Sequence, residues 1–244
     1  MKKIFLFLLV GAFLFAKDIK VNENNETITP LGGKEILVVE AKNCKFCKKF
    51  KQDVLANYHG TVPIRVVKRD DKAQGFNING IKGTPTIIFI ENGKELYAFQ
   101  GYMEEKLFYK ALAILKFGKS HVFQVAFNGA DDDKFSKEYQ EFNSTKAKDG
   151  IFVDRISGDA LFDTNDRFES NSGWLSFYNA IEGATIQRED NSTKEHKIEV
   201  IAKKSGAHLG YVFNDAPDGK KRFSINASIL EFVPRDKLKH LSHK

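Results

Sequence analysis

The spacing of hydrophobic and polar residues in the first half of the chain predicts a mixed α/β domain over residues 34–118. Short apolar runs at 35–40 and 63–67 are typical of buried strands. Between them, large apolar residues recur every fourth position with lysines in between, which predicts an amphipathic helix. The residues predicted to face the core are Phe46, Phe50, Val54 and Tyr58.

Three further elements follow in the same half. Residues 83–90 form an apolar run that begins with a proline, and Asn92-Gly93 predicts a hairpin into a strand at 94–99. Residues 103–117 have apolar positions at helical spacing and predict a closing helix. Its apolar face is expected to contain Leu107, Ala111, Leu112 and Leu115.

The pattern changes in the second half. Residues 119–150 are polar and acidic and include the run Asp131-Asp132-Asp133. From Gly150 onward, short alternating segments are broken by Gly, Asn and Asp, as in a mainly-β domain. The expected domain boundaries are therefore 34–118 and 119–236.

The two ends of the chain differ from these domains. A basic Met1-Lys2-Lys3 and an apolar run at residues 4–15, too short to span a membrane, predict a secretory signal peptide over residues 1–16. An uncleaved N-terminal anchor is the alternative, and only then do we expect a membrane contact. Either interpretation predicts export, with a periplasmic location. We expect a polar linker at 17–33 and a basic tail at 237–244.

Composition and charge narrow the class of protein. The hydrophobic content of 42% is that of a globular chain. The 38 Lys and Arg against 32 Asp and Glu give a net charge of +6, spread along the chain, which favours solubility over nucleic-acid binding. Two cysteines in an exported chain indicate that structural disulfides do not hold the fold together.

Cys44-Lys45-Phe46-Cys47 contains both cysteines of the 244 residues. A C-x-x-C motif at the start of a helix is typical of a redox-active pair. The alternatives are a zinc half-site, which needs a second ligand pair, and a static disulfide. We favour the redox interpretation, since no histidine pair with metal-ligand spacing lies near the motif. Four lysines add positive charge around it: Lys42, Lys45, Lys48 and Lys49.

The order of these elements, with the motif and the Thr84-Pro85 dipeptide, resembles the thioredoxin fold over roughly residues 31–118. The resemblance implies that Pro85 is cis and lies against the cysteine pair, where backbone groups can hold an extended substrate. It also implies that Cys44 is the attacking thiol and Cys47 the resolving thiol.

Two positions depart from the thioredoxin pattern. Asn43 stands where a tryptophan precedes the first cysteine, and Val38 stands where a buried acid is usual. Glu40, two residues later, could substitute for that acid.

Residues 149–162, 168–177, 208–215 and 222–226 resemble the B-type methionine sulfoxide reductases, which reduce the R epimer of methionine sulfoxide. Their order and spacing match that family over about residues 120–235.

The catalytic residues of that family are not all present. Its nucleophilic cysteine is replaced by Ser224, its second histidine by Tyr211, its proline after the tryptophan by Leu175, and the resolving cysteine of some members by Ser172. A thiolate attacks the sulfoxide sulfur and becomes a sulfenic acid that a second thiol resolves. A serine hydroxyl is nucleophilic only with a dedicated base.

The resemblance nevertheless implies a substrate pocket. Trp174 would pack against the substrate methyl group, and polar side chains would orient the sulfoxide oxygen. The alternative is ordinary core packing around a buried histidine that is fully hydrogen-bonded. The residues of the expected pocket are Trp174, His208, Tyr211, Asp215, Arg222, Ser224 and Asn226.

Zinc-binding members of this family have cysteine pairs that are absent here. Asp154, Ser157 and Ala202 stand at or near those positions. We therefore expect no zinc and no cofactor other than the redox-active Cys44–Cys47 disulfide.

The pattern acid-x-Asn-x-Ser/Thr occurs three times in polar segments, at Asn25, Asn143 and Asn191. It resembles the acceptor sequence of bacterial periplasmic N-glycosylation and marks these residues as glycosylation candidates. Coincidence in an Asn-rich chain is the alternative.

Three functions are compatible with the sequence. The first is an exported thiol–disulfide oxidoreductase whose second domain binds oxidised protein substrates without reducing them, with a membrane thiol donor if the pair is a reductant. The second is a working peptide-methionine (R)-S-oxide reductase for protein repair, which requires that Ser224 is an engineered change or that activity persists with serine. The third is a non-catalytic binding module with a static disulfide. We favour the first, because Tyr211 and Leu175 depart from the family as well as Ser224.

Overall fold

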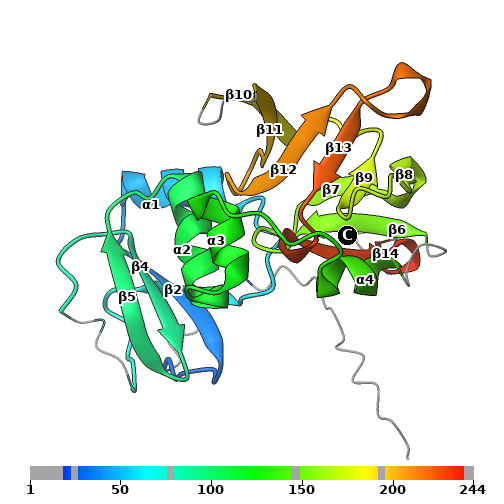
Figure 1. The fold of residues 1–244 in the computed structure, drawn as a ribbon. Coiled ribbons are helices and arrows are strands. Elements are labelled where there is room, and N and C mark those ends of the chain that lie inside the picture. Colours follow the sequence, from blue (N-terminus) through cyan, green and yellow to red (C-terminus); the bar gives the residue numbers. More distant parts are fainter. Residues whose placement is uncertain are drawn as a thin grey trace, which may run out of the picture.

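A computed structural model shows an α/β first half and a mainly-β second half that lie side by side (Figure 1). The predicted signal peptide, Asn25 and the end of the basic tail lie outside the described residues. The structure describes residues 19–22, 27–75, 78, 80–143, 149–191 and 196–238.

The first half is a five-stranded sheet in the order β1-β3-β2-β4-β5. β1 and β2 run parallel to β3, whereas β4 is antiparallel to both β2 and β5. Helices α1 and α2 pack on it, and α1 continues into a π-helical turn at Lys51–Leu55. The elements are β1 Ile19–Val21, β2 Lys34–Glu40, α1 Lys45–Phe50, β3 Ile64–Lys68, β4 Thr86–Glu91, β5 Lys94–Gln100 and α2 Glu105–Phe117.

The two central strands of this sheet confirm the predicted apolar runs. Five consecutive residues of β2 and five of β4 are buried, as expected for strands covered on both faces. The β4–β5 hairpin turns at Asn92 and Gly93, both with positive φ (51° and 77°), which is the conformation that Asn-Gly favours.

Three details differ from the sequence predictions. The segment predicted as a linker contains β1, and Ile28 is buried and bridges to Ala73. Phe46 is 62% exposed, because the inward position in the first turn of α1 is taken by Cys47. Leu107 is also exposed, and the core face of α2 instead contains Phe108, Tyr109, Leu112, Ala113 and Leu115.

The second half is mainly β, as predicted. A six-stranded sheet has the order β10-β11-β12-β13-β9-β8, and a three-stranded sheet has the order β14-β6-β7. Helices α3 (His121–Asn128) and α4 (Lys137–Asn143) precede them, and α5 (Arg235–Leu238) follows. The strands are β6 Gly150–Asp154, β7 Ala160–Asp163, β8 Arg167–Phe168, β9 Leu175–Phe177, β10 Thr185–Asp190, β11 Lys197–Ala202, β12 His208–Phe213, β13 Arg222–Ile225 and β14 Leu230–Pro234.

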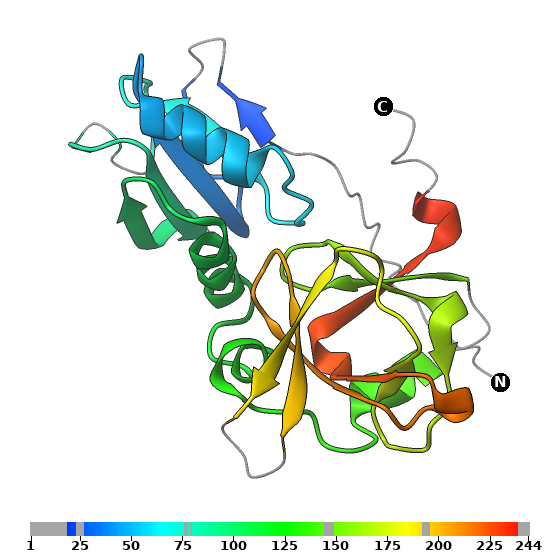
Figure 2. The same cartoon turned by 90° about the horizontal axis from the view of Figure 1, so that it is seen from above.

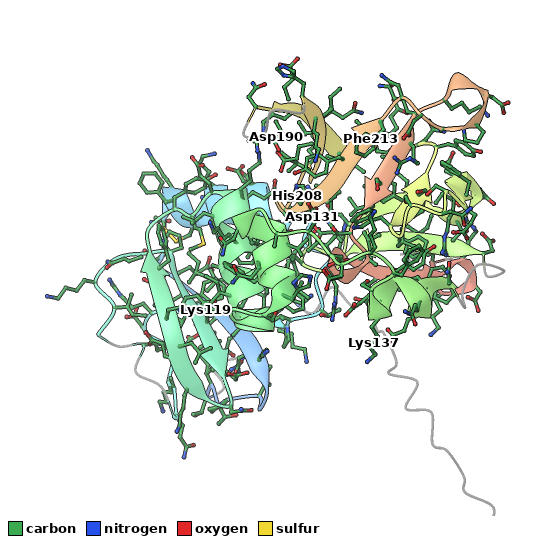
Figure 3. All side chains as sticks on the ribbon, in the orientation of Figure 1. Lys119, Asp131, Lys137, Asp190, His208 and Phe213 are labelled. Carbon is green, nitrogen blue, oxygen red and sulfur yellow. A yellow bond between two sulfur atoms is a disulfide. The ribbon has the colours of Figure 1, made fainter. Side chains whose placement is uncertain are left out.

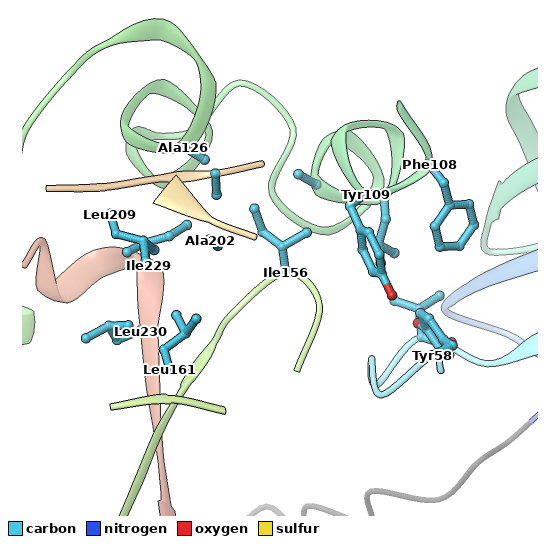
Figure 4. Packing of buried hydrophobic residues seen from close by; sticks show 14 of the residues in the cluster. Tyr58, Phe108, Tyr109, Ala126, Ile156, Leu161, Ala202, Leu209, Ile229 and Leu230 are labelled. Atoms are coloured by element: carbon cyan, nitrogen blue, oxygen red, sulfur yellow. The ribbon is translucent and has the colours of Figure 1, made fainter. Parts of the chain in front are cut away.

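A single hydrophobic cluster runs through both halves. Figure 4 shows Tyr58 and Tyr109 of the first half in the same packing as Ile156, Ala202 and Leu209 of the second. Because this core is continuous, the two halves are joined by a shared hydrophobic interface.

Polar contacts reinforce the junction between the halves. Lys204 Nζ donates to Asp159 Oδ1 at 3.1 Å and to the Asn57 carbonyl, and His59 Nδ1 lies 2.7 Å from Asp159 Oδ1. Gly158 packs so tightly on His59 that a Cβ there would lie 2.3 Å from the His59 carbonyl oxygen. The end of the helical segment that starts at the cysteine pair is therefore docked on the second half.

Among the described residues, no helix combines the length and the apolar character that crossing a membrane requires.

Candidate functional site

The second half contains a pocket of about 170 Å³ next to β12 and β13. Figure 3 labels four residues in this region: Asp131, Asp190, His208 and Phe213. Five of the seven residues predicted for the pocket line it. The lining residues are Asp131, Ser172, Trp174, Lys197, Tyr211, Phe213, Arg222, Ser224 and Asn226.

Ser224 and Tyr211 face each other across the β12–β13 ladder. Ser224 is only 9% exposed and lies at the pocket wall. The two strands approach so closely here that Gly210 (φ 143°) would place a Cβ 2.1 Å from the Ser224 carbonyl oxygen. The missing side chain at 210 thus allows β13 to present residue 224 to the pocket.

His208 lies behind the pocket, where it is buried and bonded through both ring nitrogens. Nδ1 is 2.8 Å from Glu199 Oε1, and Nε2 is 3.2 Å from Asp131 Oδ1. Burial disfavours the charged ring, but the hydrogen bonds to Asp131 and Glu199 outweigh it and raise the pKa of His208 above its ordinary 6.5. In this arrangement neither ring nitrogen is available to a substrate, and His208 instead fixes the position of Asp131.

Asn226 and Trp174 are held by the segment at Asp131 and Asp132. Asn226 Nδ2 donates to Asp131 Oδ1 at 3.0 Å, and Asn226 Oδ1 accepts from the Asp132 N–H at 2.8 Å. Trp174 Nε1 donates to the Asp132 carbonyl at 3.1 Å. These bonds fix the indole ring and the amide in one orientation at the pocket wall.

Each aromatic ring of the pocket has a cation over its face, at 4.7–5.5 Å from the centroid. Arg222 is held by two hydrogen bonds to Asp215, each 2.8 Å, so Asp215 acts behind the pocket and does not line it. The pairs are Lys134 over Trp174, Lys197 over Tyr211 and Arg222 over Phe213.

Among the described residues, no base is hydrogen-bonded to the Ser224 hydroxyl, and the Asp131 carboxylate of the pocket is instead bound by His208 and Asn226. The nearest imidazole, His208, is saturated by carboxylates. Burial raises the pKa of Tyr211 to about 12, so its phenol keeps the proton at neutral pH. A serine without a base is a weak nucleophile, so the geometry supports binding better than covalent attack.

A second buried cluster contains Asp154, Ser157 and Ala202, the residues expected at or near the family's metal-cysteine positions. Asp154 Oδ1 accepts from the Ile156 N–H and Oδ2 from Ser157 Oγ, each at 2.8 Å, and Ser205 hydrogen-bonds to the same carboxyl. Ala202 contributes only a methyl group. One carboxyl group and two hydroxyls do not match the thiolate and imidazole ligands that zinc prefers, so the residues do not fit this metal.

The cysteine pair forms a disulfide at the start of α1. Cys47 is buried, whereas Cys44 is partly exposed. Cys44 Sγ accepts from the Cys47 N–H at 3.1 Å, and the Thr84 hydroxyl lies 3.5 Å from it. The Thr84–Pro85 peptide bond is cis, as expected. Cys44 is therefore the more accessible of the two sulfurs.

The two departures from the thioredoxin pattern have clear local structures. Asn43 has φ 60°, a left-handed conformation that Asn tolerates well. Glu40 forms an ion pair with Lys51 at 2.6 Å.

Sequence reasoning missed four residues of the site: Asp131, Lys197, Glu199 and Phe213. Glu199 and Lys197 come from β11, which carries no quoted motif, and Asp131 comes from the acidic run before the β domain. Two signals could have indicated a missed residue: the acidic run contains Asp131, and the motif at residues 208–215 contains Phe213.

The fold and the two sites define a two-domain protein of the oxidoreductase class. Residues 21–116 match the family model of the thioredoxin-like domain, and residues 119–234 match that of the SelR domain. The chain is a fusion of a thioredoxin-like domain and a SelR domain, the domain of the B-type methionine sulfoxide reductases.

Proposed function

We propose that this protein is an exported thiol–disulfide oxidoreductase whose SelR domain binds oxidised methionine in protein substrates without reducing it. One observation carries the proposal. All thiol chemistry of the chain resides in Cys44 and Cys47, while the position of the family's nucleophile carries a serine that is hydrogen-bonded to no base among the described residues.

The exposure of the two sulfurs supports an order for the steps. The Cys44 thiolate attacks a sulfur of the partner's disulfide, forms a mixed disulfide and displaces one partner thiolate, which takes up a proton. The Cys47 thiolate then attacks Cys44 Sγ, releases the second partner thiol and closes the Cys44–Cys47 bond. Two electrons pass from the dithiol to the partner, and the reverse sequence oxidises a partner.

The orientation of α1 supports a partner outside the chain. The far end of its helical segment is docked on the second domain through Asn57 and His59. The end that carries the cysteines points away from that domain (Figure 2). The cysteine end of α1 is therefore not the end that contacts the second domain. If the pair works as a reductant in the periplasm, a membrane thiol donor must return it to the dithiol form.

The pocket supports binding of a methionine sulfoxide side chain. Trp174 and Phe213 supply apolar walls for the methyl and methylene groups. Lys197 and Arg222 supply cationic donors at the same pocket for the sulfoxide oxygen.

Trp174 gives a direct test, because it is the only tryptophan of the chain. We expect a peptide with methionine-(R)-sulfoxide to change the tryptophan fluorescence in a saturable manner, and the reduced peptide to have no effect. Product analysis should show no conversion to methionine. In parallel, a redox titration should show reversible oxidation of Cys44 and Cys47.

Each contrary result points to one alternative. Turnover of the R-sulfoxide peptide by the unchanged chain would establish a working sulfoxide reductase. A cysteine pair that exchanges with no partner disulfide would show that the protein is a non-catalytic binding module.

A further inference from the structure

The first turns of α1 present a lysine-rich surface around the accessible sulfur of the disulfide. The surface consists of Lys42, Lys45, Phe46, Lys48 and Lys49, all of them exposed. We call it the lysine surface.

Three of its lysines have no acidic partner within ion-pair distance in the part of the chain that the structure describes: Lys42, Lys45 and Lys48. Lys49 is bound by Asp53, which also accepts from the Tyr102 hydroxyl at 2.6 Å. Glu40 is engaged by Lys51. These two carboxylates are thus already matched, and the lysine surface keeps a positive excess.

Phe46 adds an apolar anchor at the centre of this charge. It stands between the two cysteines in sequence and is the most exposed large hydrophobic residue among those described. Aromatic side chains of this kind contribute strongly to protein interfaces when a partner covers them.

We propose that the lysine surface binds an acidic segment that flanks the reactive cysteine of the partner protein. This inference rests on the redox activity proposed above and adds the chemistry of the partner. An extended strand held beside Pro85 with its sulfur at Cys44 would place its neighbouring side chains over Phe46 and the lysines. Carboxylates in that segment would meet the cations that lack partners within the chain.

The expected effect is mainly on the rate of encounter. Charges within a Debye length, about 8–10 Å at 0.10–0.15 M salt, steer association, and steering raises rates by about 10- to 1,000-fold. An acidic partner should therefore react faster at low salt, and the advantage should fall as salt rises.

The test uses the reduced full-length chain and three peptides, each with one cysteine linked to thionitrobenzoate. The peptides differ only in glutamate, lysine or serine residues on both sides of that cysteine. Release of the coloured thiol reports the attack by Cys44. We expect the acidic peptide to react at least about 10-fold faster than the basic one in 20 mM salt, and the ratio to approach 1 in 1 M salt.

Charge reversal locates the effect. Lys45→Glu/Lys48→Glu should invert the acidic-to-basic ratio. The control Lys94→Glu/Lys119→Glu makes the same change of net charge at exposed positions outside the lysine surface and should leave the ratio unchanged. The ratio is the readout because a change in Cys44 reactivity alters both peptides equally.

Two results would overturn the inference while the redox function stands. One is equal rates for the acidic and basic peptides at low salt. The other is an acidic-to-basic rate ratio that Lys45→Glu/Lys48→Glu leaves unchanged. Failure of the serine peptide to react would overturn the redox function itself, and the inference with it.

Discussion

Tyr211 and Ser224 lie directly opposite each other on antiparallel strands β12 and β13. These are two of the positions at which the chain departs from the sulfoxide reductase pattern. Paired residues on neighbouring strands have side chains on the same face, about 4.5–5.5 Å apart at Cβ. The two departures therefore alter one spot in the pocket, where a thiol and an imidazole are replaced by two hydroxyl groups.

Restoring both groups should restore sulfoxide reduction. We expect no turnover of an R-sulfoxide peptide by the unchanged chain, measurable turnover by Ser224→Cys with dithiothreitol, and a further gain with Tyr211→His. The gain should be at least about 100-fold, since a positioned general acid–base group contributes about 10²–10⁴, and a phenol with a pKa of about 12 cannot serve as one. Conversion to methionine, followed by chromatography, measures each rate.

Ser224→Ala/Tyr211→His is the matched control and should be inactive. A double cysteine–histidine variant that binds the peptide but does not reduce it would show that the remaining pocket residues no longer place the sulfoxide near residue 224.

The chain's own cysteine pair should not reduce the sulfenic acid that forms at position 224 of the Ser224→Cys variant. We expect reduced Ser224→Cys, freed of external reductant and diluted, to convert one sulfoxide per chain, because the end of α1 that carries the cysteines lies away from the second domain (Figure 2). Recycling by Cys44 and Cys47 would supply two more electrons and raise the yield to two per chain. The same variant with Cys44→Ser supplies the baseline of one.

The Asp131–His208 contact should make pocket stability depend on pH. The folded pKa of His208 is raised, so its contribution is complete below about 6.5 and is lost as pH rises through the folded value. The hydrogen bond from His208 lowers the pKa of Asp131, so its contribution is present above 3.8 and is lost as pH falls through the folded value. Asp131→Asn should therefore lower the free energy of unfolding most between these two pH values.

Two measurements check this. Denaturant unfolding of Asp131→Asn and the unchanged chain should converge at alkaline pH, and the NMR titration of the His208 ring should shift to a lower pKa in the variant. An unaltered His208 titration would contradict the contact.

The polar junction should couple the unfolding of the two domains. Lys204 is largely enclosed between Asp159, the Asn57 carbonyl and the Tyr109 ring. Removing it deletes two hydrogen bonds, to Asp159, which keeps His59 as a partner, and to the exposed Asn57 carbonyl, at a cost of about 0.5–1.5 kcal/mol each. We expect calorimetry to show one transition for the unchanged chain, and a lower or split transition for Lys204→Ala. The exposed neighbour Lys203→Ala should change little.

The glycosylation candidates should differ in occupancy. Asn191 is exposed after β10, whereas Asn143 is half-buried and accepts a hydrogen bond from Arg167 at 2.9 Å. In protein purified from its native host, peptide mass spectrometry should find more glycan on Asn191 than on Asn143. A bare Asn191 beside a modified Asn143 would contradict the accessibility argument.

Local sequence signals predicted much of this molecule. Apolar runs predicted β2 and β4, Asn92-Gly93 predicted the hairpin, and the family motifs brought Trp174, Arg222 and Ser224 to one pocket. These features depend on short-range propensity or on spacing within a motif.

Features that depend on tertiary partners were not predictable. Phe46 fits a helical apolar stripe but lies beyond the reach of the core, and β1 is a three-residue edge strand in a polar segment. His208 was expected to contact the substrate, yet its partners Asp131 and Glu199 are distant in sequence and occupy its ring nitrogens.

The direction of α1 also limits which partner proteins can use both sites at once. The accessible sulfur is at the end of α1 opposite its contact with the second domain, whereas the pocket lies within that domain at β12 and β13. A small disulfide or a short oxidised peptide can occupy only one of them at a time. A single partner that uses both sites would have to be a polypeptide long enough to reach from the start of α1 to β12 and β13, and its two contacts would then strengthen each other through their shared tether.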